Sequence, residues 1–469
     1  MIKSVQTSAP PTSRQIRACA PFGLELSPGA PPPIPGAQPA AEHIRTTLAR
    51  GQIAFLSGPS GSGKSTSMRT LAEQLQARDQ RIIVHTDTIP PGTRLIDLFG
   101  QEVSPEQTLR HLAAFGLAEP ALVARTVGEL SEGQRHRAQL ARTFFDAAES
   151  HTKWVLIDEF AAVLDRVTAL GLAATIGRQT RAAGIRLVCA AAHDDLQAAL
   201  EPDLTIRFEL DDSWRVLEPT DEGGLSITIE PGTQADMDAL LPHHYIAGRP
   251  ATRVGFLRAY DQTSDNLAGV LVVSMPTLCG VWRQQAWPGR YAGRDRKAAT
   301  RRINAELRCI SRVIIDPRYR GLGLATRLVR TYLDSPLSPA TEAVAAMGSI
   351  CPFFERAGMT AYRVPMHAAD ARLADAIEAA GYEPWMLADP GRACVLLAHP
   401  LVAAELYRWA RARRLVEQSD RVLCRMAGAR LSIESMAYAA VTPPNTTAPT
   451  TAHHPGGGID EQQEQARFE

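Results

Sequence analysis

The alternation of short apolar runs with longer helical patterns divides the chain into two α/β units. In the first unit, residues 41–220, apolar runs of four or five residues are separated by segments of helical pattern. Such alternation predicts a mainly parallel sheet covered by helices. The predicted strands are 53–56, 81–85, 154–157 and 186–189, followed by one or two closing strands within 205–217.

A second α/β unit is predicted from residue 225, because Glu222-Gly223-Gly224 has the composition of a boundary. We place it at 225–440, with strands at 254–260 and 270–274 and a third that ends near residue 315. Residues 366–440 are rich in Ala, Leu and Arg, and we expect them to be mostly helical and to complete this domain.

The two ends of the chain have a different composition. Residues 1–40 are rich in proline, which predicts an extended, flexible N-terminal segment. Residues 441–469 lack the apolar residues that a core requires, which predicts a disordered tail.

Bulk composition excludes several classes of protein. The 469 residues carry no net charge, so no global field favours nucleic acid or a membrane surface. The longest mainly apolar run, 269–282, contains Pro276 and is too short to span a bilayer, and the start of the chain has no signal-peptide pattern. The seven cysteines are scattered without C-x-x-C spacing, which argues against a disulfide framework or zinc site. We therefore expect a cytoplasmic protein without a membrane partner.

A phosphate-binding loop follows the first predicted strand. Residues 58–66 read Gly-Pro-Ser-Gly-Ser-Gly-Lys-Ser-Thr, the pattern G-x-x-x-x-G-K-S. The glycines let the backbone turn tightly, so that successive N–H groups point into one anion-sized nest. Lys64 can reach the β- and γ-phosphates of ATP, and the Ser65 hydroxyl can ligate Mg²⁺. The residues expected to bind the nucleotide here are Gly58, Ser60, Gly61, Gly63, Lys64, Ser65 and Thr66.

Two acids end the apolar run at 154–157. Asp158 is placed to hold Mg²⁺, directly or through water, and Glu159 to polarise the water that attacks the γ-phosphate. Together with the loop at 58–66, these acids predict an ATPase.

The segment between these motifs carries a family resemblance. Residues 130–135 read Leu-Ser-Glu-Gly-Gln-Arg, and the chain resembles the ABC ATPase family, whose signature is L-S-G-G-Q. Asp165 falls in a segment that resembles the family's D-loop, and His193 resembles its switch histidine, which implies a catalytic role beside Glu159. The resemblance implies a homodimer through the ATPase domain, in which Ser131, Gly133 and Gln134 of one subunit face the ATP of the other. No clear glutamine follows the strand at 81–85, as the family's transporters have, which argues against coupling to a membrane subunit.

A second phosphate cradle is predicted at residues 313–325. The run reads as a strand, a turn and a helix start, and it resembles motif A of GNAT acetyltransferases, Q/R-x-x-G-x-G/A. Backbone N–H groups at a helix N-terminus would receive the pyrophosphate of acetyl-CoA. The residues expected to bind this cofactor are Ile315, Arg318, Arg320, Gly321, Gly323 and Ala325. A segment at 352–359 resembles the family's late F-Y-E-x-x-G-F pattern.

The acetyl-transfer chemistry needs a proton acceptor and a proton donor. Glu306 is the candidate base, with a solvent-facing structural role as the equal alternative. The family's acid is a tyrosine, but Phe353 and Phe354 stand at that position, which leaves Cys351 or Tyr362 as substitutes.

Clues to the acceptor are basic and aromatic. Arginines within 290–302 lie near Trp282 and Trp287, and residues 407–414 form a second basic, aromatic stretch. Such residues can hold an RNA, or they form solvated surfaces of no special function.

The fold class that follows is α/β: a P-loop NTPase domain of ABC type, followed by a GNAT α/β domain. The predicted function is a soluble ATPase coupled to a GNAT N-acetyltransferase that uses ATP, Mg²⁺ and acetyl-CoA and acetylates an amine on RNA or protein. One alternative is a nucleic-acid-associated ABC ATPase whose GNAT domain is not catalytic. A further alternative is that the chain is the ATP-binding subunit of an ABC transporter.

Overall fold

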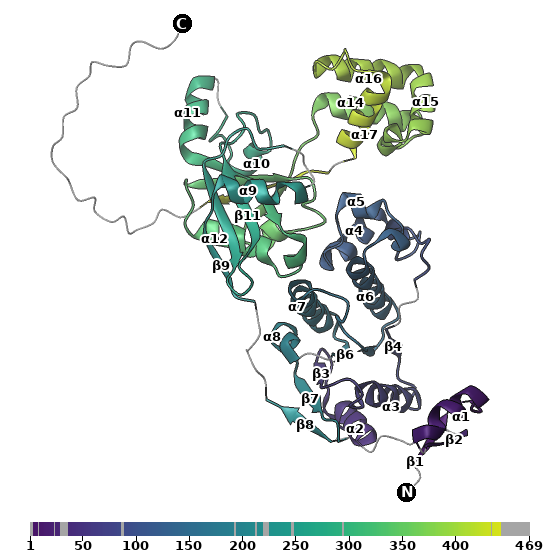
Figure 1. The fold of residues 1–469 in the computed structure, drawn as a ribbon. Helices are drawn as coiled ribbons and strands as arrows, with labels where there is room; N and C mark the ends of the chain where they lie inside the picture. Colours follow the sequence, from purple (N-terminus) through teal and green to yellow (C-terminus); the bar gives the residue numbers. More distant parts are fainter. Residues whose placement is uncertain are drawn as a thin grey trace, which may run out of the picture.

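The computed structural model describes residues 3–7, 9–22, 24–28, 36–85, 89–191, 194–211, 213–218, 225–244, 248–292, 295–432 and 434–441. Figure 1 shows two α/β units and a helical lobe formed by α14 to α17. The two predicted α/β units are therefore present, and the lobe is an additional body.

The Pro-rich N-terminal segment contains more regular structure than the sequence predicts. Strand β1 (Lys3–Thr7) pairs in parallel with β2 (Leu24–Pro28), and α1 (Ser13–Cys19) and η1 (Ala20–Phe22) connect them. Helix α1 begins at a capping box, in which Thr12 and Gln15 satisfy each other's backbone N–H groups. Local capping thus produces order that a proline count does not reveal, although α1 buries no residue.

The first domain is built on a six-stranded sheet of order β4-β5-β6-β3-β7-β8. Every neighbouring pair is parallel except β7 and β8, which are antiparallel. The strands are β3 (Ile53–Ser57), β4 (Ile82–Val84), β5 (Trp154–Ile157), β6 (Arg186–Ala190), β7 (Leu204–Phe208) and β8 (Trp214–Leu217). The four predicted strands and the closing pair are confirmed.

Helices cover both faces of this sheet, so its central strands are apolar on both sides. Ala54 and Leu56 of β3 pack on one face, in the cluster that includes residues of α2 and α3. Ile53 and Phe55 pack on the other face, in the cluster that includes residues of α4, α6 and α7. The helices are α2 (Ala37–Thr47), α3 (Lys64–Gln76), α4 (Pro105–Ala114), α5 (Pro120–Val123), α6 (Glu132–Glu149), α7 (Arg166–Ala183) and α8 (Gln197–Leu200).

The second domain contains a seven-stranded sheet of order β14-β15-β13-β12-β11-β10-β9. Neighbours are antiparallel except β12 and β13, which are parallel. The strands are β9 (Ile227–Pro231), β10 (Gly255–Asp261), β11 (Asn266–Ser274), β12 (Leu307–Ile315), β13 (Ala340–Ala345), β14 (Thr360–Arg363) and β15 (Met436–Val441). Helices α12 (Leu324–Asp334) and α13 (Phe353–Arg356) cover one face. Residues of α9 (Gln234–Leu240), α10 (Arg283–Ala286) and α11 (Arg296–Glu306) belong to clusters on the other.

The helical lobe lies in the chain between β14 and β15. Its helices, α14 (Ala368–Ala379), α15 (Pro390–Ala398), α16 (Pro400–Ala412) and α17 (Asp420–Leu431), form their own core. The buried carboxylate of Asp370 accepts hydrogen bonds from Trp409 Nε1 at 2.7 Å, Arg413 Nη2 at 2.5 Å and Arg430 Nε at 3.3 Å. The helical composition of 366–440 is confirmed, but β15 lies in the sheet and was not expected. In the part of the chain that the structure describes, no helix is both long and apolar enough to cross a bilayer.

Candidate functional sites

The loop between β3 and α3 has the geometry of an anion nest. Gly58, Gly61 and Gly63 have φ angles of 127°, 84° and 99°, which side chains with a Cβ rarely adopt. A Cβ at Gly58 would collide with the carbonyl oxygen of Phe208. Lys64, Ser65 and Thr66 form the first turn of α3, whose N-terminal N–H groups favour a negative ligand.

Lys64 holds the loop in a compact shape. Its Nζ atom donates to the carbonyl oxygens of Gly58 at 2.6 Å and Pro59 at 2.8 Å. Within the described part of the chain, the N–H groups of Gly61 and Gly63 have no hydrogen-bond acceptor, and the buried hydroxyl of Ser62 has no partner. Several hydrogen-bond donors without acceptors in one loop can bind the oxygens of a triphosphate. Ser60 is exposed at the tip of the loop.

The two acids lie at the same edge of the sheet as this loop. Asp158 and Glu159 follow the end of β5, the loop follows the end of β3, and β6 lies between the two strands. Because all three strands are parallel, their carboxyl ends meet at one edge, where α/β sheets bind ligands. Glu159 has a positive φ of 50°, and its N–H donates to Asp158 Oδ1 at 3.0 Å. The predicted His193, which follows β6, lies outside the described residues.

The signature segment lies at the N-terminus of α6. Ser131 caps this helix and forms a reciprocal capping box with Gln134, with N···O distances of 3.0 and 3.3 Å. Ser131 is exposed and Gly133 is half-buried beside Leu164. Over the described ranges, no hydrogen bond joins this segment to the loop at 58–66. Asp165 caps the next helix, α7, by accepting from the N–H of Thr168 at 3.1 Å.

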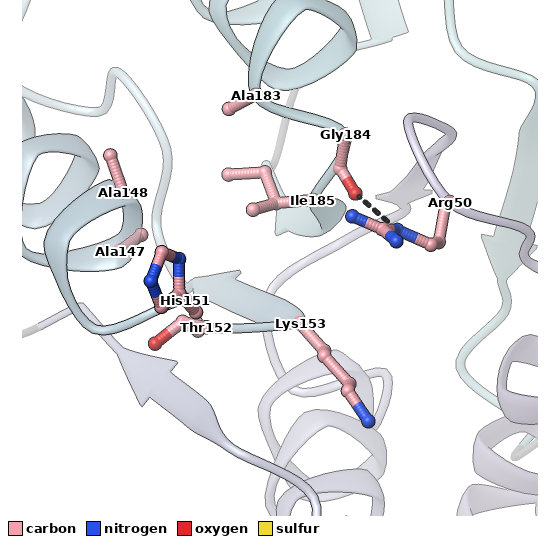
Figure 2. Close-up of a pocket in the computed structure, with 9 residues that line it drawn as sticks. All are labelled: Arg50, Ala147, Ala148, His151, Thr152, Lys153, Ala183, Gly184 and Ile185. Atoms are coloured by element: carbon pink, nitrogen blue, oxygen red, sulfur yellow. Dashed lines mark hydrogen bonds between the residues drawn. The ribbon is translucent and has the colours of Figure 1, made fainter.

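A separate cavity of about 360 Å³ lies at the opposite edge of the same sheet (Figure 2). Arg50, Lys153 and Ile185 line it and precede β3, β5 and β6, whereas the nucleotide residues follow the ends of strands. Its position excludes it from the chemistry of the loop at 58–66.

The second predicted cradle joins β12 to α12. After η6 (Pro317–Tyr319), Gly321 and Gly323 adopt positive φ angles of 89° and 74°, and Gly323 caps the eleven-residue helix α12. The N–H groups of Gly321, Leu322 and Gly323 have no acceptor in the described ranges. Ile315 ends β12 and Ala325 lies in the first turn of α12. This loop can receive a pyrophosphate.

Both arginines of this loop are engaged in ion pairs. Arg318 donates through Nε and Nη2 to Asp316, at 3.1 and 2.9 Å. Burial opposes the charge of Asp316, but the hydrogen bonds from Arg318 prevail and lower the pKa of its carboxyl. Arg320 pairs with Glu119, a residue of the first domain.

A fork opens in the sheet beside this loop. Strands β12 and β13 pair only through residues 307–310 and 340–343. Residues 311–315 of β12 continue toward the cradle with no described strand on that side. Among the described residues, Ser311 O accepts from Arg312 Nη1 at 2.7 Å and Ile315 O from Arg320 Nε at 3.4 Å. The remaining backbone groups on this side have no strand partner there and can pair with an extended ligand chain.

Glu306, the predicted base, already accepts a hydrogen bond from an arginine. Glu306 ends α11 rather than lying on a strand, and its carboxylate accepts from Arg290 Nε at 2.9 Å. A second acid, Glu342 on β13, is buried and accepts from Arg283 Nε at 2.7 Å and Nη2 at 2.6 Å. Neither carboxylate is free of an arginine.

A tyrosine that sequence reasoning missed lies beside the fork. Tyr438 on β15 is opposite Ala343, which is opposite Ile310, the last β12 residue paired with β13. Its Oη atom is buried without a hydrogen-bond partner among the described residues, and burial raises its pKa to about 12. The local sequence gave no signal, because Tyr438 and Phe354, which it contacts, are far apart in the chain. Tyr362, the earlier candidate, packs against Trp282 on the opposite face.

Comparison with known proteins concerns the first domain. A family model described as "ABC transporter" matches residues 41–162. The chain is 30% identical over 178 residues to the cytochrome c biogenesis ATP-binding export protein CcmA of Ruegeria pomeroyi, which covers 34% of this chain and 81% of that protein. It is 27% identical over 190 residues to the spermidine/putrescine import ATP-binding protein PotA of Pseudomonas fluorescens, or 35% of this chain and 51% of the relative.

The lengths of these relatives differ. The chain spans about half the length of PotA and 40% of the putrescine transport ATP-binding protein PotG of Escherichia coli, to which it is 32% identical over 28% of its own length. A solved dimeric structure of a bacterial ABC transporter cassette aligns with a TM-score of 0.30 and 18% identity, over 37% of this chain and 89% of the cassette.

Proposed function

We propose, because the chain belongs to the family of ABC transporter ATP-binding proteins, that its ATPase domain works in a head-to-tail homodimer. The observation that carries the ATPase site is the shared sheet edge at which the loop at 58–66 meets Asp158 and Glu159. This arrangement supports the proposal, because phosphoryl transfer requires phosphate-binding, metal-binding and water-activating groups close together.

Each residue at this edge has a distinct role in the proposal. Lys64 exchanges its loop carbonyl contacts for the β- and γ-phosphate oxygens, and the Ser65 hydroxyl and Asp158 hold Mg²⁺. The Glu159 carboxylate orients the attacking water. His193 stays a predicted catalytic residue by resemblance alone.

The homodimer follows from the position of the signature segment. Ser131 and Gly133 lie at the N-terminus of an 18-residue helix, where a negative ligand is favoured, but no hydrogen bond between described residues connects them to their own loop at 58–66. A second copy of the chain can present its bound triphosphate to this helix end. Two chains would then complete two nucleotide sites.

For the second domain we propose acetyl transfer from acetyl-CoA to an amine. The open N–H groups of residues 321–323 and the fork beside residues 311–315 support a site for the pyrophosphate and the pantetheine arm. Acetyl-CoA supplies the activated thioester: the amine nitrogen bonds to its carbonyl carbon, the C–S bond breaks, and the thiolate takes up the proton that the nitrogen loses. Tyr438 lies where its hydroxyl could donate a hydrogen bond to the leaving sulfur, and Glu306 remains the candidate base.

The surface that would meet an acceptor is basic but not aromatic. Helix α11 exposes four cations and lies at the amino end of β12, opposite the cradle; they are Arg296, Lys297, Arg301 and Arg302. Trp282 and Trp287, by contrast, are only 4% and 8% exposed and pack in a core cluster. The second basic stretch is also partly structural, because Trp409 and Arg413 bind Asp370. Contacts to RNA phosphates or an acidic protein are therefore favoured over base stacking.

A second candidate function is that of a transporter's ATP-binding subunit, because the curated relatives are named as import and export ATP-binding proteins. The surface between the nucleotide loop and the signature, which the family's transporters use for the membrane subunit, here contacts the chain's own second domain. Arg110 Nε donates to Ser349 O at 3.2 Å, and Glu119 pairs with Arg320. These contacts favour an internal partner for the ATPase.

The test is incubation of the purified chain with labelled acetyl-CoA and size-fractionated cell extract, with and without ATP. A labelled macromolecule that depends on an intact Gly321 supports acetyl transfer. ATP hydrolysis without any labelled product would contradict it and leave the nucleic-acid-associated ATPase with a non-catalytic second domain. Co-purification with a membrane permease would favour the transporter.

A further inference from the structure

One face of helix α7 contacts the loop that we assign to acetyl-CoA. Val167 packs against the core of the second domain, and a Cβ added at Gly171 would lie 3.3 Å and 3.5 Å from the carbonyl oxygens of Arg318 and Arg320. Four residues further on, Thr175 lies against Gly321, where any Cβ would strike its hydroxyl. Arg178 donates to the Gly321 carbonyl oxygen. The spacing of 4, 4 and 3 residues forms a single stripe, and Figure 1 shows α7 at the end of the first domain nearest the second.

A charged cluster lies beside this stripe and joins the signature helix to the cradle. Arg137 of α6 donates to the carbonyl oxygens of Gly133 at 3.4 Å and Gly116 at 3.5 Å. Burial lowers the pKa of Arg137, and the nearby charge of Arg320 lowers it further, while Glu119 opposes the shift. Arg137, Glu119 and Arg320 therefore share one half-buried environment.

The start of α7 adds a second link between the ATPase motifs and the cradle. The hydrogen bond to Asp316 is the main cause of the raised pKa of Arg318, and the charge of Asp165, the N-cap of α7, adds a smaller contribution in the same direction. The signature segment, the D-loop-like segment and the acetyl-CoA loop thus meet in one region of the molecule.

Arg320 cannot serve two anions at once. While its guanidinium is paired with Glu119, its charge is neutralised, and the Glu119 carboxylate stands close to the place where a pyrophosphate would bind. The negative charge of the Glu119 carboxylate would repel a doubly charged pyrophosphate bound nearby, and this repulsion is strong where water is partly excluded.

We propose that Glu119 regulates the acetyl-CoA site: its ion pair with Arg320 holds the cradle in a low-affinity state, and closure of an ATP-bound dimer on the signature releases Arg320 for the pyrophosphate. This inference rests on the acetyl-CoA site proposed above. The signal comes from the partner subunit, whose triphosphate arrives at Ser131 and Gly133, one helical turn from Arg137. A new negative charge there attracts Arg137 and favours a rearranged cluster.

Thermodynamic linkage relates the binding of ATP to the binding of coenzyme A. If ATP raises the affinity for coenzyme A by a given factor, coenzyme A must raise the affinity for ATP by the same factor. We expect roughly tenfold, within the range of ordinary allosteric coupling.

The experiment measures coenzyme A binding by calorimetry in the full chain carrying Glu159→Gln, which is expected to bind ATP without hydrolysing it. The parent should bind coenzyme A about tenfold more tightly when ATP and Mg²⁺ are present. Adding Glu119→Gln should give that tight binding without ATP and remove the response to ATP. The matched control is Glu106→Gln, an exposed acid of α4, which should behave like the parent.

The outcomes separate this inference from the proposed function. Coenzyme A binding that is unaffected by ATP and by Glu119→Gln overturns the regulation and leaves the acetyl-CoA site intact. No binding in any variant overturns the site and the regulation together.

A readout without coenzyme A completes the test. Amide hydrogen exchange of residues 316–324 should accelerate when ATP is added to the parent, and should already be fast in Glu119→Gln. Exchange that ATP leaves unchanged contradicts the proposed release of Arg320.

Discussion

The Nζ atom of Lys64 lies 2.6 Å from the carbonyl oxygen of Gly58, within the loop to which both residues belong. The ammonium group thus donates to two loop carbonyls at the N-terminus of α3, beside the N–H groups of Gly61 and Gly63, which have no acceptor among the described residues. Phosphate oxygens offer this cation a stronger, charge-assisted partner than a carbonyl does. The loop is therefore arranged for a triphosphate before one arrives.

Replacement of Lys64 tests this arrangement directly. Lys64→Ala removes a donor aimed at developing phosphate charge, so we expect ATP hydrolysis to fall by roughly 100-fold or more, as for other lost electrostatic donors. Phosphate release from the purified chain measures it. Lys153→Ala, which changes an exposed lysine at the opposite edge of the same sheet, should retain the parental rate.

The head-to-tail dimer predicts complementation between two inactive variants. Lys64→Ala disables the nucleotide loop, and Ser131→Arg would block the signature with a bulky side chain. Each variant alone should be inactive, but in a mixed dimer one composite site pairs an intact loop with an intact signature. ATPase activity should therefore reappear on mixing, and a mixture that stays inactive would argue against shared sites.

The nucleotide site was predictable because its parts are local. Strand β3, the loop and α3 are contiguous, so their sequence alone indicates the nest, and the parallel order of β3, β6 and β5 brings Asp158 to it. Strand β15 was not predictable in this way, because Ala439 pairs with Thr360 across the whole helical lobe. The burial of Trp282 also escaped prediction, since it depends on packing against distant Tyr362.

Contacts between the domains were the least predictable feature. Glu119 and Arg320 are 201 residues apart, and neither has a neighbouring sequence that indicates its partner. The motif indicated that Arg320 belongs to a phosphate loop but not that an acid from another domain pairs with it. An ion pair between residues so far apart in the sequence can be identified only from the three-dimensional fold.

Thiol reactivity should divide the cysteines by burial. Burial raises the pKa of Cys309 to about 12 and that of Cys424 to about 11, because a thiolate is disfavoured away from water. Cys279 and Cys394 are exposed. At about pH 7.5, roughly one unit below an unperturbed thiol pKa, a maleimide should label Cys279 and Cys394 in the native chain. Peptide mapping identifies the labelled cysteines. Cys309 is half-buried, so rapid labelling there would contradict the raised pKa of its thiol.

The ion pair between Arg283 and Glu342 should matter more when broken than when replaced. Both side chains are almost fully buried, at 4% and 3% exposure. Glu342→Ala strands a buried guanidinium and should lower the free energy of unfolding by about 3–5 kcal/mol. The double variant Arg283→Met/Glu342→Leu should be near neutral. Urea unfolding followed by tryptophan fluorescence measures both, since Trp282 and Trp287 lie on the same face of the sheet. Equal destabilisation by the single and double variants would contradict the argument.

Tyr438→Phe separates a chemical role from a packing role at the fork of the second sheet. The Oη atom has no hydrogen-bond partner among the described residues, so its removal leaves no donor or acceptor unsatisfied and should change the free energy of unfolding by less than about 1 kcal/mol. With a pKa of about 12, the phenol keeps its proton beside a thiolate and stabilises it by hydrogen bonding rather than by proton transfer. Loss of such a donor should lower the rate of acetyl transfer by roughly 100-fold while acetyl-CoA binding stays unchanged.

In the parent this contribution should persist to about pH 10, because a raised pKa preserves the donor form. Tyr332→Phe, at a buried tyrosine of the same core cluster, is the matched control and should keep the parental rate. If Tyr438→Phe also keeps that rate, Tyr438 is a packing residue and the leaving sulfur has another donor.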